Sequence, residues 1–201
     1  MKTLSSLLLI CILAASSQAA TITGKVVVTG ARDSRDVVVY IGRIESKTFT
    51  PPSESKVLDQ IYLTFKPHVL TIQAGTRVKF PNSDEIRHNV FSPNAVDGKR
   101  FSLGTYAAGT FKDWVFAKPG VITLLCNVHI EMSAYIVVTE TPYSAVTDAT
   151  GTYIIKDVPP GKYTLNAWHE RNVLNERRGF QSRTVEITSA DGLVSVPFEL
   201  K

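Results

Sequence analysis

The sequence predicts an all-β protein that folds as two β-sandwiches. Short segments rich in Val, Ile, Thr and Tyr recur along the 201 residues, and clusters of Gly, Pro, Asn, Asp and Ser separate them. No segment repeats its apolar residues with the period of a helix. The apolar content of 44% and the charged content of 20% suit one or two globular domains rather than a disordered chain.

The first predicted strands lie near the N-terminus. Residues 21–29 and 36–41 are rich in β-branched side chains, and the polar residues 30–34 between them predict a turn. Residues 46–56 are polar and contain two adjacent prolines, so we expect a linker there.

Two further groups of strands follow the linker. The first group is predicted at residues 65–75, 76–80, 114–120 (a strand that ends in a turn), 121–126 and 134–139. Residues 121–126 are almost entirely apolar, which is expected for a strand in the interior of a sandwich. The second group is predicted after Pro142, at residues 144–147, 152–155, 162–168, 183–187 and 194–200.

The first 19 residues have the pattern of a secretory signal peptide. Lys2 gives a basic start, residues 7–13 are apolar, and Ser17-Gln18-Ala19 offers a small-x-small cleavage site. The alternative is a retained membrane anchor, although the apolar run is short for a bilayer span. No later segment is long and apolar enough to cross a membrane. We therefore expect a periplasmic or secreted protein with no membrane span after signal cleavage.

The cysteine count predicts a single thiol in the mature chain. The chain has two Cys residues, and Cys11 leaves with the predicted signal peptide, so Cys126 can form no internal disulfide. An unpaired thiol in an oxidising compartment is protected either by burial or by metal ligation through its thiolate. The neighbouring His129 and Met132 favour ligation.

Four residues offer the ligand set of a type 1, or blue, copper site. Cys126, His129 and Met132 share one short loop, spaced C-x2-H-x2-M, and His88 lies upstream. A thiolate and two imidazoles accommodate copper in an electron-transfer site, and a weak axial thioether tunes its potential. The alternative is a buried free Cys126 with a surface His129 and with Met132 packed in the core.

Residues 57–139 resemble the cupredoxins, in particular the plastocyanin-like and amicyanin-like members of that family. The resemblance rests on the order of the four ligands, the short Cys–His–Met loop, Asn89 after His88, and Lys118-Pro119-Gly120 before the Cys-bearing strand. It implies a Greek-key β-sandwich that binds one type 1 copper ion through His88, Cys126, His129 and Met132. It also implies that Asn89 braces the Cys-bearing loop by hydrogen bonding.

The metal loop departs from the usual cupredoxin pattern. Ser or Thr after the Cys and Pro near the His are replaced by other residues, namely Asn127, Val128, Ile130 and Glu131. Glu131 places a carboxylate on a rim that is often apolar in the family. The departure leaves the four ligands in place.

Residues 143–201 resemble the carboxypeptidase regulatory-like, transthyretin-like β-sandwiches. The resemblance rests on residues 146–153 and 158–165, and residues 22–26 and 37–41 are similar to the opening strands of that fold. It implies a discontinuous domain, 20–45 plus 141–201, with the linker 46–56 and a cupredoxin domain at 57–140 inserted between its strands. The alternative is two domains in series. A fold of this kind does not by itself identify a function.

The cupredoxin resemblance implies an exported carrier of single electrons rather than an enzyme. Its partners would be a dehydrogenase or a c-type cytochrome, His129 would be the exit for the electron, and the loop is similar to that of methylamine-utilisation cupredoxins. The alternatives are a copper storage or delivery protein and a structural or ligand-binding sandwich with a vestigial copper site. The net charge of +4 is spread along the chain, which gives no support to nucleic-acid binding.

Two further histidines have expected roles outside the ligand set. His68 follows Pro67 near the expected metal end of the sandwich, where it is an extra ligand, a titrating neighbour, or a surface or capping residue. His169 is expected to be structural and to pair with Glu170.

Overall fold

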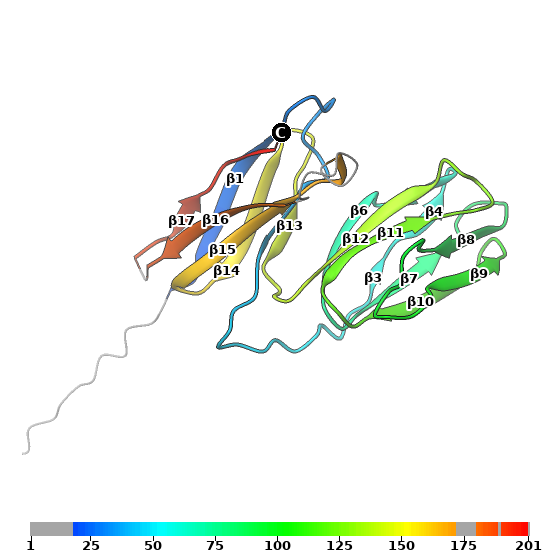
Figure 1. The fold of residues 1–201 in the computed structure, drawn as a ribbon, viewed down its shortest axis with the longest axis horizontal. Helices are drawn as coiled ribbons and strands as arrows, with labels where there is room; N and C mark the ends of the chain where they lie inside the picture. The colour runs from blue at the N-terminus through cyan, green and yellow to red at the C-terminus, as the bar shows by residue number, and fades with distance from the viewer. Residues whose placement is uncertain (1–17, 172–179, 189, 201) are drawn as a thin grey trace, which may run out of the picture.

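The computed structural model describes residues 18–171, 180–188 and 190–200 and confirms the all-β class. The elements defined in the described residues are the β-strands β1 to β18, which form two sandwiches side by side (Figure 1). The predicted signal peptide, residues 1–19, lies outside the described residues except for Gln18 and Ala19. In the described part of the chain, no helix is long and apolar enough to span a bilayer.

The middle sandwich is formed by ten strands between residues 56 and 139. They are β3 (Lys56–Val57), β4 (Asp59–Ile61), β5 (Thr64–Lys66), β6 (Val69–Gln73), β7 (Thr76–Pro81), β8 (His88–Phe91), β9 (Ser102–Tyr106), β10 (Phe111–Phe116), β11 (Gly120–Leu125) and β12 (Ser133–Thr139). One sheet has the order β6–β12–β11–β8–β9, the other has the order β10–β7–β3, and β4 pairs with β5. The core between the sheets comes from alternate residues, as in β7, where Val78 and Phe80 are buried and Arg77 is exposed.

The terminal sandwich combines strands from both ends of the chain. They are β1 (Ala20–Val28), β2 (Val38–Ile41), β13 (Ser144–Val146), β14 (Thr152–Val158), β15 (Gly161–Trp168), β16 (Phe180–Ile187), β17 (Leu193–Ser195) and β18 (Phe198–Leu200). In one sheet β1 lies between β14 and β17 and also pairs with β18, and the other sheet has the order β13–β2–β15–β16. Residues 20–41 therefore share both sheets of this sandwich with residues 144–200.

Two predicted strands are each divided at a proline. The prediction of one strand over residues 65–75 is wrong because the chain forms β5 and β6 on either side of Pro67. Residues 194–200 are likewise divided into β17 and β18 around Pro197. Proline has no N–H to donate to a strand ladder. The sequence pattern also fails to predict the short strands β4, β8 and β9.

Strand β12 is buried on both faces because it lies between the two sandwiches. Ala134, Ile136 and Val138 belong to the core of the middle sandwich. The opposite face forms the junction cluster with the terminal sandwich, whose buried members are Val38, Val69, Tyr135, Val137 and Trp168. The rings of Tyr135 and Trp168 lie 5.4 Å apart at this junction. Burial on both faces explains why residues 134–138 form an uninterrupted apolar run.

Candidate metal centre

Two neighbouring segments at one end of the five-stranded sheet carry the predicted ligands. His88 is the first residue of β8, and Cys126 directly follows β11. The two strands are antiparallel and Leu125 pairs with Phe91, so the residues before Phe91 lie opposite those after Leu125. His88 therefore lies beside the β11–β12 loop, which also carries His129.

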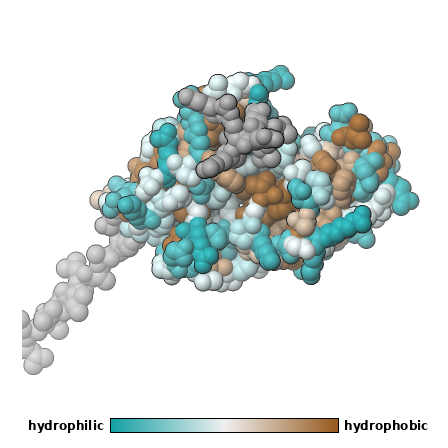
Figure 2. Space-filling model, viewed as in Figure 1, coloured by the Kyte–Doolittle hydropathy of each residue, from teal (hydrophilic) through white to brown (hydrophobic). Residues whose placement is uncertain are grey.

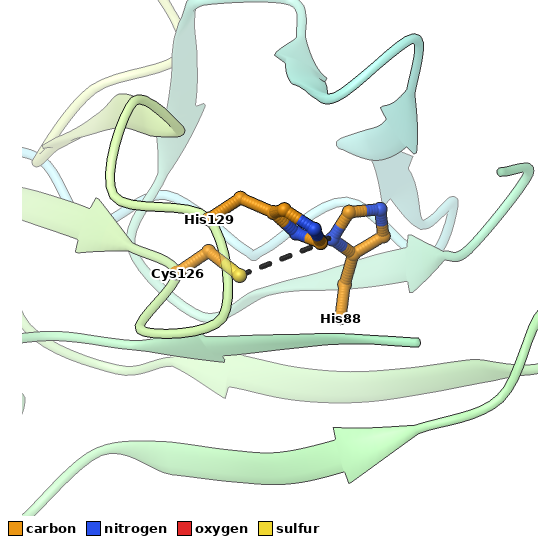
Figure 3. Close-up of side chains that lie close together, drawn as sticks. All are labelled: His88, Cys126 and His129. Atoms are coloured by element: carbon orange, nitrogen blue, oxygen red, sulfur yellow. Dashed lines mark hydrogen bonds between the residues drawn. The ribbon is translucent and has the colours of Figure 1, made fainter. Parts of the chain in front are cut away.

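Three donor atoms converge between these segments (Figure 3). His88 Nδ1 lies 3.9 Å from Cys126 Sγ and 3.0 Å from His129 Nδ1, and the three ligand atoms are all within 4.8 Å of one another. His88 and Cys126 are buried, and His129 is half-buried. Such separations suit two imidazole nitrogens about 2.0 Å, and a thiolate sulfur about 2.3 Å, from one ion. The group formed by His88, Cys126 and His129 could therefore hold a metal ion.

A carboxylate fixes the orientation of His88. His88 Nε2 donates a hydrogen bond to Asp84 Oδ2 at 2.8 Å. Burial acts to raise the pKa of Asp84, but hydrogen bonds from the Leu63 amide, His88 and the Tyr62 amide outweigh it and hold the pKa below its usual value. The ionised carboxylate keeps the His88 proton on Nε2, so the Nδ1 lone pair faces Cys126 and His129. Asp84 is not among the predicted site residues, and its only signal in the sequence is its position four residues before His88.

Backbone and side-chain hydrogen bonds brace the loop that carries Cys126. Asn89 Oδ1 accepts a hydrogen bond from the Asn127 amide at 2.9 Å, as the cupredoxin resemblance implied. The Cys126 amide donates to the Met132 carbonyl at 3.3 Å, and the Met132 amide donates to the His129 carbonyl at 3.1 Å. Met132 is buried in the same core cluster as Cys126. The four predicted ligands thus lie in one hydrogen-bonded region, in which His88, Cys126 and His129 form the three-atom group.

His68 lies outside that three-atom group and connects the two sandwiches. Its Nε2 lies 3.1 Å from Glu170 Oε2, and its Nδ1 lies 3.1 Å from the Ser133 carbonyl. The expected pairing of Glu170 with His169 is therefore wrong, because Glu170 pairs with His68. His169 is buried, and its Nδ1 accepts a hydrogen bond from the Arg171 amide. Of the three roles considered for His68, the titrating neighbour agrees best with this geometry.

The His68–Glu170 pair predicts a pH-dependent contribution to stability. The hydrogen bond with Glu170 raises the pKa of His68, although burial acts to lower it, and the same bond lowers the pKa of Glu170. A raised histidine pKa stabilises the folded chain below the unfolded pKa of about 6.5, and this contribution is lost as the pH rises through the folded pKa. Both side chains are about one-third exposed, so we expect His68→Gln to cost only about 0.5–1 kcal/mol at about pH 5.5, and less at about pH 8.5.

Urea unfolding of the wild type and His68→Gln at both pH values measures this contribution. The difference between the two proteins isolates His68 from His169, whose pKa burial lowers and whose own pH dependence has the opposite sign. Glu170→Gln removes the same pair from the other side and should show a similar cost at about pH 5.5. Equal costs of His68→Gln at both pH values would contradict the prediction.

One Cys and two His at one end of a β-sandwich form a candidate metal site. The chain matches no protein-family model and no curated protein. Among solved structures, it is similar to a purple cupredoxin from Nitrosopumilus maritimus, with 24% identity over 42% of this chain and 100% of that chain and a TM-score of 0.37. A Cu-containing nitrite reductase from Thermus scotoductus SA-01 is 23% identical, over 58% of this chain and 28% of the reductase, with a TM-score of 0.41. A mutant of amicyanin in its oxidised form is 21% identical, over 44% of this chain and 96% of amicyanin, with a TM-score of 0.39.

Proposed function

We propose that this protein is an exported type 1 copper protein that carries single electrons between redox partners. The observation that carries the proposal is the convergence of one thiolate and two imidazole nitrogens at a largely buried end of the middle sandwich. This donor set suits a copper electron-transfer site. His88, Cys126 and His129 would hold the ion, and Met132 would be the weak axial ligand. Copper bound there supplies the one-electron redox chemistry.

The residues around the ligands would keep the site nearly unchanged when an electron enters or leaves. Asp84 holds His88, Asn89 holds the backbone after Cys126, and close packing resists movement of the buried side chains. These residues would position and shield the centre. We propose that the centre serves an electron carrier rather than an enzyme.

The half-buried His129 offers a route to the surface for the electron. Its neighbours Val128 and Ile130 are exposed, and Ile130 is 85% exposed. Figure 2 shows hydrophobic surface at the end of the middle sandwich where the β11–β12 loop lies in Figure 1. Apolar residues around a half-exposed ligand suit brief docking of a redox partner, which we propose to be a dehydrogenase or a c-type cytochrome.

The location and the domain division form part of the same proposal. The signal-peptide pattern and the single thiol support a periplasmic or secreted protein. We assign residues 57–140 to the copper domain, and 20–45 together with 141–201 to a carboxypeptidase regulatory-like domain. The pairing of β1 with β14 and of β2 with β15 supports the discontinuous division.

Addition of one equivalent of Cu(II) to the chain from Ala20 tests the proposal. We expect an intense visible thiolate-to-copper band that a one-electron reductant bleaches and reoxidation restores. Copper binding without that band would favour the storage or delivery alternative. A chain that binds no copper would contradict the carrier function and favour the structural alternative.

A further inference from the structure

The β4–β5 hairpin turns through two residues that rarely adopt its backbone conformation. Tyr62 and Leu63 connect the strands, and both have a φ of 57°. Two-residue turns with positive φ at both positions favour Asn-Gly, whereas Tyr and Leu are disfavoured there. Strain of this kind persists only where surrounding structure holds the backbone in place.

Asp84 is the group that holds this turn. Its Oδ1 accepts a hydrogen bond from the Tyr62 amide at 2.6 Å, and its Oδ2 accepts one from the Leu63 amide at 3.0 Å. The same Oδ2 accepts the 2.8 Å hydrogen bond from His88 Nε2. The Asp84 side chain is only 12% exposed and that of His88 is fully buried, so this contact is shielded, unlike a surface ion pair. One carboxylate thus joins the hairpin turn to a predicted metal ligand.

The turn also presents apolar surface beside that carboxylate. Tyr62 is 74% exposed, and Leu63 and Ile86 are about half exposed. Together with Asp84 these three residues help to line a surface pocket of about 450 Å³. Tyr62 and Leu63 therefore place large side chains, which an Asn-Gly turn would lack, beside the Asp84 carboxylate that holds His88.

We propose that Asp84 is a positioning residue that holds His88 and the β4–β5 turn as one unit, setting both the affinity of the site for Cu(II) and its reduction potential. This inference rests on the proposed copper function. A hydrogen-bonded carboxylate makes the His88 imidazole a stronger donor and fixes its tautomer, and its negative charge favours the more positive oxidation state of the ion.

The metal-free protein provides the first test. In the wild type, two-dimensional ¹H–¹⁵N spectra of the imidazole should place the His88 proton on Nε2, and the Tyr62 and Leu63 amides should exchange slowly. We expect Asp84→Ala to give a mixture of His88 tautomers and at least about tenfold faster exchange of both amides, because each amide loses its acceptor. Asp113→Ala is the matched control, because Asp113 accepts a hydrogen bond from Arg77 on the other sheet of the same sandwich, away from β8 and β11. A wild-type tautomer and wild-type protection in Asp84→Ala would overturn the proposal.

The copper-loaded protein provides the second test. We expect Asp84→Ala to weaken Cu(II) binding about 10–100-fold, as is typical when a partner of a metal-bound histidine is lost. Each tenfold loss that falls on Cu(II) alone raises the reduction potential by about 59 mV. Tyr62→Asn combined with Leu63→Gly keeps both backbone donors and should leave the potential unchanged. An unchanged potential in Asp84→Ala would overturn the role of the carboxylate, and an equal shift in the turn variant would overturn its assignment to Asp84.

These tests separate the inference from the proposed function. If the wild type forms no thiolate-to-copper band, the copper function fails, whereas the spectra of the metal-free protein still decide whether Asp84 positions His88. Asp84→Asn, which preserves the side-chain volume but not the charge, replaces Asp84→Ala if that variant does not fold.

Discussion

The Cys126→Ser variant is expected to lose the intense visible band of the copper-loaded protein and to bind Cu(II) more than about 100-fold more weakly. The band requires a thiolate bound to copper, and a serine hydroxyl does not ionise near neutral pH. The loss should exceed that caused by changes outside the ligand set, which typically reach about 10–100-fold. Visible absorption and competition with a chelator of known affinity measure the two effects.

The structure supplies controls for the Cys126→Ser experiment. Ser is close to Cys in size, so the fold should survive, although burial of a hydroxyl at a position 3% exposed is expected to cost about 1–3 kcal/mol. Far-UV circular dichroism and urea unfolding check this point. Val128→Ala changes an exposed neighbour of His129 in the same loop and should keep the full band. An intense band in Cys126→Ser would show that Cys126 is not the thiolate ligand.

Much of the fold and of the three-atom group follows from local sequence patterns. Alternation of apolar and polar residues sets the strands, and the fixed spacing of Cys126 and His129 places both in one loop after an apolar strand. Placing His88 beside them required the order of residues that the cupredoxin resemblance provides, because His88 comes from another strand. The structure places its Nδ1 3.0 Å from that of His129.

Contacts that depend on the path of irregular segments could not be predicted in this way. Asp84 reaches His88 only because of the conformation of residues 82–87, which has no periodic pattern. Glu170 was expected beside His169, yet it lies in the segment after the end of β15 and meets His68, 102 positions away. A strand was predicted at residues 134–139, but its sequence does not show that Trp168 from the terminal sandwich covers the second face of β12.

Trp168→Ala is expected to lower the free energy of unfolding by about 3–5 kcal/mol, the largest stability effect predicted for this chain. Trp168 is fully buried at the end of β15, and its ring packs against Tyr135 of β12. Removal of the indole would leave a cavity at the junction cluster. This cavity could not collapse completely, because both sandwiches are closely packed around it. Urea unfolding followed by far-UV circular dichroism measures the loss.

Two matched variants and one spectroscopic readout show whether this cost arises at the junction. Trp168→Phe retains an aromatic ring beside Tyr135 and should lose less stability. Trp114→Ala removes a half-buried tryptophan that packs against Phe101 within the middle sandwich, and its smaller burial predicts a smaller cost. Because Trp168 packs on the face of β12 opposite to the core that contains Cys126 and Met132, the copper band of folded Trp168→Ala should match that of the wild type at 25 °C. A cost below about 1 kcal/mol would mean that the junction cluster contributes little, and an altered band would mean that packing at the junction also sets the geometry of the metal loop.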